Sequence, residues 1–217
     1  MNKIELAKFF DHTLLKQDMT NKDLEILIKD YLDYGFSTIC IPPMYIQKAM
    51  EINKTAVIAT VIDFPLGYSG LTSKLCQANL ALEQGAAEID LVATIPHIKN
   101  GNLQLYSNEI SAIKRLMPNN ILKVIIETSL LTPTEIITAS QICESSGADF
   151  VKTSTGYGSR GASIDDIKLI KQGAPNTKIK ASGGIKTLSQ AEEFIRLGVK
   201  RIGSSNSKQI IDLFVIS

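Results

Sequence analysis

The stretch DFVKTSTGYG, residues 149–158, decides how the rest of the chain is interpreted. It places Lys152 at the end of a short apolar run and follows it with small residues. The stretch KIKASGG, residues 178–184, repeats this arrangement around Lys180. A charged amine among apolar residues is costly to bury unless it is paired or used chemically. The repeat therefore raises two questions, which fold buries these segments and what the two amines do.

Short apolar segments rich in β-branched residues alternate along the whole chain with longer segments of helical period. Each short segment is too uniformly apolar for an antiparallel strand with one face in water, so a parallel sheet covered by helices is indicated. The predicted strands are residues 9–13, 37–41, 56–62, 88–93, 122–127, 150–154, 178–182 and 201–205.

Capping signals place helices between these predicted strands. A serine or threonine followed three residues later by an acidic residue marks predicted helix starts at Thr20, Thr132 and Ser163. Glycines that can adopt the left-handed conformation end several predicted helices just before the next strand. These glycines are Gly35, Gly85, Gly147 and Gly198.

A repeated βα unit with eight short buried strands predicts an α/β protein with a (β/α)8 fold, the TIM barrel. The alternative is a doubly wound open sheet, but no glycine-rich dinucleotide fingerprint follows the first predicted strands. No linker-like stretch divides the chain, so residues 1–217 are predicted to form a single barrel domain.

The overall composition is that of an ordinary globular protein, with 44% hydrophobic and 21% charged residues among 217. A net charge of +1 argues against a nucleic-acid partner. No apolar run approaches the ~20 residues of a membrane span, and the N-terminus lacks a signal-type apolar core. The three cysteines are scattered, and two histidines alone cannot build a metal site. A cytoplasmic protein without metal or membrane partner is expected.

Chemistry in a barrel of this kind lies at the C-terminal ends of the strands. The last polar residues of the successive predicted strands are Asp11, Cys40, Asp63, Asp90, Glu127, Lys152, Lys180 and Ser204. For Cys40 and Asp63, a simple return to polar sequence at the strand end is the favoured interpretation. Asp90, Lys152 and Lys180 are expected to converge at the barrel mouth if they point inward. A purely structural salt-bridge cluster would have the same sequence pattern.

Two loops of small residues favour a functional site over a structural cluster. Gly183 and Gly184 follow the seventh predicted strand, and Gly203 to Asn206 follow the eighth. Bare glycine backbone lets N–H groups approach an anion, and a helix N-terminus adds a favourable dipole. The loops after strands seven and eight commonly bind phosphate in this fold. A small phosphorylated substrate is therefore predicted.

Two neighbouring lysines suit covalent catalysis on a carbonyl. A free lysine has a pKa of about 10.4, so well under a thousandth is neutral at pH 7. Burial and a nearby like charge both disfavour the ammonium form, so each lysine could activate the other as a nucleophile. The resulting protonated imine is an electron sink for carbon–carbon cleavage, and Asp90 could transfer protons through water. The residues alone leave open which lysine is the nucleophile.

Seven stretches of the sequence together match the pattern of a known family. In their order along the chain they are FFDHTLLK, ATVIDFPLG, EIDLVATI, KVIIETSLLT, DFVKTSTGY, KASGGIKT and RIGSS. With these stretches the chain closely resembles the deoxyribose-phosphate aldolase family over nearly its whole length. The ordered set is far more specific than any one of its members. The resemblance implies the reversible cleavage of 2-deoxy-D-ribose 5-phosphate into acetaldehyde and D-glyceraldehyde 3-phosphate, without metal or organic cofactor.

The resemblance also implies roles for individual residues. Lys152 of VKTSTGY is the Schiff-base nucleophile, and Lys180 of KASGG is the activating lysine, which also donates and accepts protons. Asp90 of EIDLV likewise donates and accepts protons. Asp11 of DHTLL is a supporting carboxylate near Lys180. The loops that bind the substrate phosphate contain Gly156, Gly183, Gly184, Gly203 and Ser205.

The chain departs from the family pattern outside the three proposed catalytic positions. Asn206 replaces a serine or glycine, Asp63 replaces a glycine or neutral polar residue, and Pro42 and Pro43 replace a more open turn. A C-terminal tyrosine of some members has no counterpart, because the last tyrosine is Tyr157. These departures predict an altered phosphate affinity and either a modest turnover or proton transfer by another group.

Two other functions fit the same residues. A metal-free phosphosugar isomerase or decarboxylase would use Asp90 or Glu127 as base and a lysine only as an electrostatic clamp, with no covalent imine. A non-catalytic barrel that binds phosphate ligands would be expected to have lost one of the two lysines or Asp90, and all three are present.

Three further residues and the assembly complete the sequence-based expectations. Cys40 is expected to be a buried packing residue, with reactivity toward aldehydes as the alternative. His12 and His97 are interpreted as structural. Barrels of this kind commonly form homodimers through outer helices, but no outer face of this sequence identifies the contact.

Overall fold

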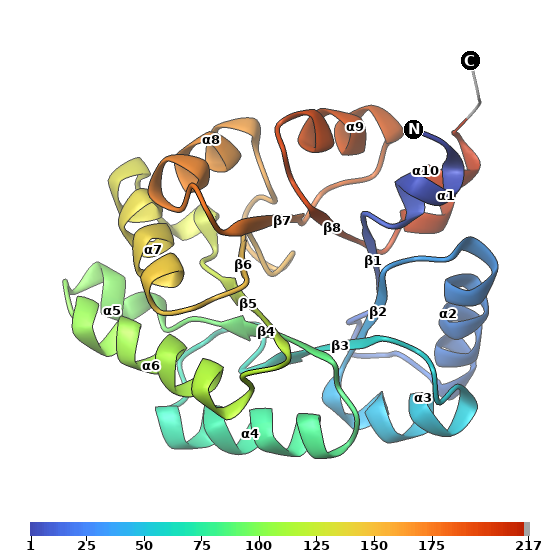
Figure 1. Cartoon of the computed structure of the whole chain (residues 1–217), viewed down its shortest axis with the longest axis horizontal. Helices are drawn as coiled ribbons and strands as arrows, with labels where there is room; N and C mark the ends of the chain where they lie inside the picture. Colours follow the sequence, from blue (N-terminus) through green and yellow to red (C-terminus); the bar gives the residue numbers. More distant parts are fainter. Residues whose placement is uncertain (215–217) are drawn as a thin grey trace.

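The computed structural model describes residues 1–214 and shows a closed barrel of eight parallel strands (Figure 1). Each strand pairs with the next along the chain, and β8 closes on β1, with Phe10 opposite Ile202 and Asp11 opposite Gly203. The strands are β1 (Phe10–Thr13), β2 (Thr38–Ile41), β3 (Ile58–Ile62), β4 (Glu88–Val92), β5 (Ile121–Ile125), β6 (Phe150–Lys152), β7 (Lys178–Ser182) and β8 (Arg201–Ser204). The barrel prediction is confirmed, and the open-sheet alternative is wrong.

Helices surround the barrel, with at least one after each strand (Figure 1). The α-helices are α1 (Lys3–Ala7), α2 (Asn21–Tyr34), α3 (Ile46–Ile52), α4 (Leu71–Glu83), α5 (Ile95–Lys99), α6 (Leu103–Leu116), α7 (Pro133–Ser145), α8 (Ile164–Gly173), α9 (Leu188–Arg196) and α10 (Ser207–Asp212). Two short 3-10 helices are η1 (Pro43–Tyr45) and η2 (Thr128–Leu130). The C-terminal end without a tyrosine falls partly on residues 215–217, outside the described part of the chain.

The predicted helix starts are confirmed by reciprocal caps. The side chains of Thr20, Thr132 and Ser163 each accept a hydrogen bond from the backbone N–H three residues later. The acidic side chain at that later position accepts a hydrogen bond from the backbone N–H of the cap residue. Gly35 ends α2 in the left-handed conformation, with φ 67°.

In the part of the chain that the structure describes, none of the helices has both the length and the apolar composition of a membrane-spanning segment.

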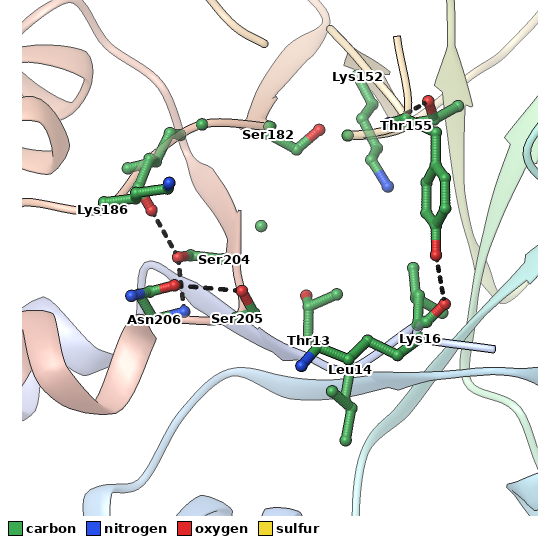
Figure 2. Close-up of a pocket in the computed structure, with 17 residues that line it drawn as sticks. Thr13, Leu14, Lys16, Lys152, Thr155, Ser182, Lys186, Ser204, Ser205 and Asn206 are labelled. Atoms are coloured by element: carbon green, nitrogen blue, oxygen red, sulfur yellow. Dashed lines mark hydrogen bonds between the residues drawn. The ribbon is translucent and has the colours of Figure 1, made fainter. Parts of the chain in front are cut away.

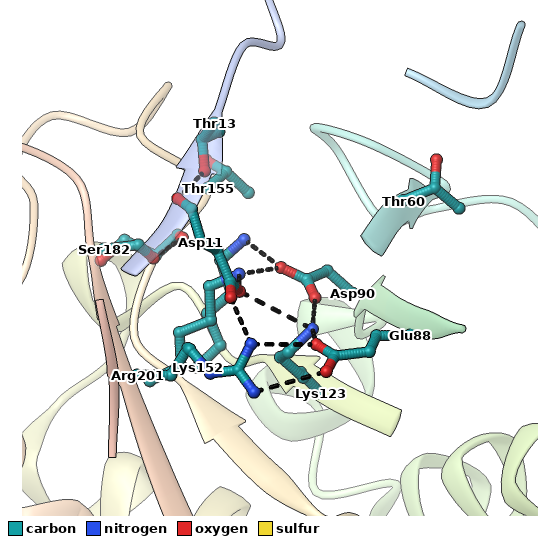
Figure 3. A network of polar contacts seen from close by, with 12 residues as sticks. Asp11, Thr13, Thr60, Glu88, Asp90, Lys123, Lys152, Thr155, Ser182 and Arg201 are labelled. Carbon is teal, nitrogen blue, oxygen red and sulfur yellow. Dashed lines mark hydrogen bonds and ion pairs between the residues drawn. The ribbon is translucent and has the colours of Figure 1, made fainter. Parts of the chain in front are cut away.

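The two faces of each strand bury different chemistry. On β4, the apolar side chains of Ile89 and Leu91 belong to the large hydrophobic core, whereas Glu88 and Asp90, also buried, belong to a cluster of ion pairs (Figure 3). Side chains alternate between the two faces of a strand, so these two sets point in opposite directions. The interior of the barrel is therefore largely ionic, with a small apolar cluster around Cys40 beside it.

Candidate active site

Asp90 lies at the centre of the interior cluster. One of its oxygens, Oδ2, is 2.7 Å from the amine of Lys152 (Figure 3). The same oxygen is 2.7 Å from the amine of Lys180. Lys152 and Lys180 are register partners on β6 and β7, so neighbouring strands deliver both amines to one carboxylate. Asp11, on β1, forms an ion pair with Lys180. The four residues that the sequence singled out as catalytic or supporting thus lie in contact.

Three further charged residues in this cluster were missed by sequence reasoning. The amine of Lys123 is 2.7 Å from Asp90 Oδ1 and 2.6 Å from Glu88 Oε2. Arg201 pairs with Asp11 and lies 3.3 Å from Glu88. Lys123 interrupts an apolar strand with a charge, and Arg201 begins one, and these signals could have found them. Because Glu88 and Arg201 begin their strands, these residues form a layer beneath the reactive groups.

The charges in this cluster do not balance when every group is ionised. Its cations are Lys123, Lys152, Lys180 and Arg201, and its carboxylates are Asp11, Glu88 and Asp90. One cation is in excess, and an unpaired charge in a water-poor interior is unfavourable. Loss of a proton from one lysine would therefore relieve the cluster.

The surroundings distinguish the two candidate nucleophiles. Burial lowers the pKa of Lys152, and the positive charge of Lys180 adds to this effect against the attraction of Asp90. Burial also acts to lower the pKa of Lys180, but Asp11 and Asp90 together outweigh it, so the pKa of Lys180 is raised. Lys152 is consequently the amine that loses its proton more easily, and it also lines the adjacent cavity, as Lys180 does not.

Asp90 remains ionised in this setting. Burial alone would raise its pKa, but Lys123, Lys152 and Lys180 together hold the pKa of this carboxyl well below its usual range. An ionised carboxylate shared by three amines can accept a proton and pass it on with little movement of heavy atoms. This arrangement suits proton transfer next to a reacting group.

A cavity of about 290 Å³ opens above Lys152 (Figure 2). The predicted phosphate-binding residues all line it, and they are Gly156, Gly183, Gly184, Gly203 and Ser205. Asn206 lines the same cavity. The strand-end lysine and the small-residue loops therefore border one space, which is large enough for a small phosphorylated molecule.

Two exposed amines at the rim of this cavity were not anticipated. Lys16 comes from the loop after β1 and Lys186 from the loop after β7, and they lie on opposite sides of the cavity (Figure 2). Neither lysine is the last polar residue of a predicted strand, so the sequence alone did not connect them with the site. Both add positive charge beside loops that otherwise offer only neutral donors.

The loops after β6 and β7 approach each other more closely than a side chain would permit. A Cβ atom built on Gly161 would lie 2.0 Å from the backbone oxygen of Gly183. The backbone N–H of Ala162 donates to the oxygens of Ser182 and Gly183 at 3.1 and 3.3 Å. Gly183 itself has φ 83°, a conformation that glycine adopts at little cost. Gly161 is thus a structural requirement of the predicted phosphate loops.

We expect Gly161→Ala to weaken binding of phosphorylated ligands by roughly 5- to 150-fold, because the added methyl group must push the loop after β7 away from its position. Forcing an extra methyl group into a well-packed region costs about 1–3 kcal/mol. The measurement is the dissociation constant of inorganic phosphate by calorimetry. Gly70→Ala is the matched control, because a Cβ there meets nothing within 4 Å. Unchanged phosphate affinity in folded Gly161→Ala would contradict this prediction.

Two other strand-end carboxylates have structural partners. Glu127 lies beyond the end of β5 in the left-handed region, with φ 47°. Its Oε2 accepts hydrogen bonds from the backbone N–H and the hydroxyl of Thr155, at 2.9 and 2.6 Å. Asp63 accepts two hydrogen bonds from Ser69 and lies 3.3 Å from the amine of Lys74. Both carboxylates anchor loops, and neither lines the cavity above Lys152.

Cys40 is fully buried, packed with Ala59 and Val61 inside the barrel. Burial raises the pKa of its thiol, which keeps it in the less reactive protonated form. The packing interpretation of this residue is confirmed. Within residues 1–214, no group of three or more histidine, cysteine or acidic side chains is arranged to hold a metal ion.

The fold and this site define a (β/α)8-barrel enzyme whose reactive groups are amines and carboxylates at the C-terminal ends of the strands. The family model described as DeoC/LacD family aldolase matches residues 6–202. The chain belongs to this family, which confirms the resemblance inferred from the sequence motifs.

Individual relatives agree over almost the whole chain. The chain is 44% identical over 208 residues to the deoxyribose-phosphate aldolase of Clostridioides difficile (strain 630), covering 95% of both chains. It is 47% identical over 204 residues to that of Mesomycoplasma hyopneumoniae (strain 232), covering 93% of this chain and 92% of the relative. The tetrameric deoxyribose phosphate aldolase of Aeropyrum pernix has a similar structure, with a TM-score of 0.91, 29% identity and coverage of 97% and 91%.

Proposed function

We propose that this chain reversibly cleaves 2-deoxy-D-ribose 5-phosphate into acetaldehyde and D-glyceraldehyde 3-phosphate through a Schiff base on Lys152. The observation that carries the proposal is the buried Lys152 amine, 2.7 Å from Asp90, at the floor of a cavity lined by glycine and serine loops. Relatives with 41% to 47% identity carry the name deoxyribose-phosphate aldolase, which supports the same substrate for this chain.

The reaction begins with the neutral amine of Lys152 and the open-chain aldehyde of the substrate. The amine attacks the C1 carbonyl to form a carbinolamine, and loss of water gives a protonated imine. Removal of the proton from the C3 hydroxyl then breaks the C2–C3 bond, and its electron pair moves toward the imine nitrogen. D-Glyceraldehyde 3-phosphate leaves, and an enamine remains on Lys152. Protonation at C2 and hydrolysis, which consumes one water, release acetaldehyde.

In this scheme Asp90 transfers protons and Lys180 supplies a fixed positive charge. Asp90 contacts both amines, so it can accept a proton from the carbinolamine and return one to the enamine, directly or through water. Lys180, held as an ammonium by Asp11 and Asp90, keeps a positive charge beside Lys152 throughout. That charge favours the neutral form of the nucleophile before attack.

The phosphate end of the substrate would lie at the opposite side of the cavity from the buried carboxylates. The bare backbone at Gly183, Gly184 and Gly203 can present N–H donors to an anion, and the hydroxyl of Ser205 can add another. Lys16 and Lys186 would neutralise its charge.

The isomerase or decarboxylase alternative loses one of its two candidate bases. Glu127 already accepts hydrogen bonds from Thr155 and Ser129 and does not line the cavity. Asp90 lies between three amines, an arrangement that serves covalent catalysis by a lysine better than an isolated base.

The decisive experiment is borohydride reduction in the presence of acetaldehyde, followed by peptide mass mapping, alongside a cleavage assay with 2-deoxy-D-ribose 5-phosphate. We expect a reduced ethyl adduct on Lys152. An adduct on Lys180 would keep the aldolase chemistry and reverse the roles of the two lysines. Absence of any adduct in folded protein over a range of pH would refute the Schiff-base mechanism and favour the isomerase or the binding barrel.

The pH dependence of imine formation tests the role of Lys180. Only the neutral amine attacks, so trapping with acetaldehyde and cyanoborohydride should rise with pH, with a midpoint below the ordinary lysine value of 10.5. In Lys180→Met the midpoint should move to higher pH, because the neighbouring positive charge that disfavours the Lys152 ammonium is gone. The trapped adduct is quantified by mass spectrometry. An unchanged midpoint in the folded variant would contradict this role.

Three broader expectations remain predictions. We propose that residues 1–217 form one domain, which the barrel from β1 to β8 supports. We propose a cytoplasmic location, in keeping with three unpaired cysteines, two of them buried. A homodimer is also proposed, and light scattering would test it, with a tetramer like that reported for the Aeropyrum pernix enzyme as the other outcome.

A further inference from the structure

His12 lies next to Asp11 on β1, but its side chain points away from the charged interior, because side chains alternate along a strand. The residue is 5% exposed, and its ring stacks on Phe36 with ring centres 4.7 Å apart. Ring nitrogen Nδ1 is 2.6 Å from the hydroxyl of Ser207, the first residue of α10. The mechanism above uses none of these groups.

This contact continues as a chain of hydrogen bonds to the cavity wall. The hydroxyl of Ser207 lies 3.0 Å from the backbone oxygen of Ser204. The hydroxyl of Ser204 donates to the backbone oxygen of Ile185 at 2.7 Å and accepts from the backbone N–H of Asn206 at 3.0 Å (Figure 2). Ser204, Asn206 and Ile185 all line the cavity, so the chain connects β1 to both predicted phosphate loops.

The two nitrogens of the His12 ring have different neighbours. Nδ1 faces the hydroxyl of Ser207, and Nε2 lies 3.6 Å from a carboxylate oxygen of Asp30. The hydroxyl of Ser207 has one proton, which goes either to Nδ1 or to the backbone oxygen of Ser204 according to the tautomer of the ring. Burial lowers the pKa of His12 to about 4, against the attraction of Asp30, while Lys208 also lowers it. The ring is therefore neutral at ordinary assay pH, and it acts as a fixed hydrogen-bond partner of Ser207 and not as a titrating group.

We propose that His12 is a positioning residue for the substrate phosphate, which through Ser207 holds the loop after β8 against the loop after β7. This inference rests on the proposed function, because it assigns the phosphate of that substrate to these loops. His12 touches no reacting atom, so its contribution should concern the phosphate group alone. Preorganised donors bind an anion better than donors that must first be ordered.

Packing alone is the competing explanation, since a buried histidine stacked on Phe36 could serve only the core. His12→Phe separates the two explanations, because it keeps an aromatic ring for the stack and removes the contact between Nδ1 and Ser207. Ser207→Ala removes the other half of the contact. His12→Asn places an amide group, which can donate or accept a hydrogen bond, near the position of Nδ1 and is the conservative rescue variant. His97→Phe is the matched control at the other histidine, which lies on α5.

The test compares 2-deoxy-D-ribose 5-phosphate with 2-deoxy-D-ribose, which lacks the phosphate. In His12→Phe and Ser207→Ala we expect KM for the phosphorylated substrate to rise about tenfold, with kcat/KM for the unphosphorylated sugar within about twofold of wild type. The double variant should lose little more than either single variant, because both remove one contact. His12→Asn should recover part of the loss, and His97→Phe should match wild type.

Equal losses on both substrates, or no loss on either, would overturn the inference. Calorimetric binding of inorganic phosphate gives a readout that does not depend on turnover, and affinity should fall about tenfold in the same two variants. The wild-type protein could cleave neither sugar and still bind phosphate, with the phosphate affinity reduced in the two variants. In that case the proposed function fails while the positioning role stands. If wild type cleaves the phosphorylated sugar and the variants bind phosphate normally, only the positioning role fails.

Discussion

Lys152→Met should abolish cleavage of 2-deoxy-D-ribose 5-phosphate, with a loss in kcat/KM of about 10⁴-fold or more, and should eliminate the acetaldehyde adduct. Methionine has a similar length but no amine, so no imine can form at this position. The variant should fold normally, because Asp90 keeps Lys123 and Lys180 as partners and the cluster loses its excess cation. Loss of activity would therefore report on chemistry.

The measurement is a coupled cleavage assay together with borohydride trapping and a thermal unfolding curve. Lys114→Met is the matched control. Lys114 forms a 2.7 Å ion pair with Asp149, which immediately precedes β6, whereas Lys152 ends that strand. This control should lose some stability and keep its activity. An undiminished adduct in Lys152→Met, mapped to Lys180, would show that the roles of the two lysines are reversed.

Asp90→Asn should lower kcat by about 10³-fold, which is within the range for loss of a general acid–base group. The imine should remain detectable in this variant. Asparagine cannot accept and return a proton, so both the dehydration of the carbinolamine and the protonation of the enamine should slow. The attraction of Asp90 raises the pKa of Lys152, so its removal leaves this amine more easily neutral. On long incubation, acetaldehyde should therefore still be trapped on Lys152 in this variant.

Asp90→Asn should also be destabilising, by about 3–5 kcal/mol, because breaking a buried ion pair leaves its partners uncompensated. Urea unfolding measures this loss, and kcat is compared at a temperature at which the variant is folded. Glu109→Gln is the matched control, since Glu109 is 3% exposed and lies 2.9 Å from Lys74, outside the catalytic cluster. It should lose stability with kcat within about threefold of wild type. A kcat for Asp90→Asn within tenfold of wild type would remove Asp90 from the proton relay.

The predicted phosphate loops show how far sequence reasoning reached at the site. The glycines at positions 183 and 184 and the residues 203–206 could be assigned to one cavity because their place after the last two strands is a property of the barrel. Gly161 could not, because its importance comes from an approach to Gly183, which is 22 positions away in the sequence. The importance of His12 likewise arises from Ser207, 195 residues away.

The sequence by itself determined the barrel, the helix starts and the strand ends that carry Asp90, Lys152 and Lys180. These features are local, since capping, apolar period and glycine turns depend on residues a few positions apart. Only the tertiary structure decided that Lys123 and Glu88 share the interior with them. It also decided that the carboxylate of Glu127 binds Thr155 and does not line the cavity. It also distinguished the two lysines, because a pKa depends on burial and on charges that other strands bring within a few ångströms.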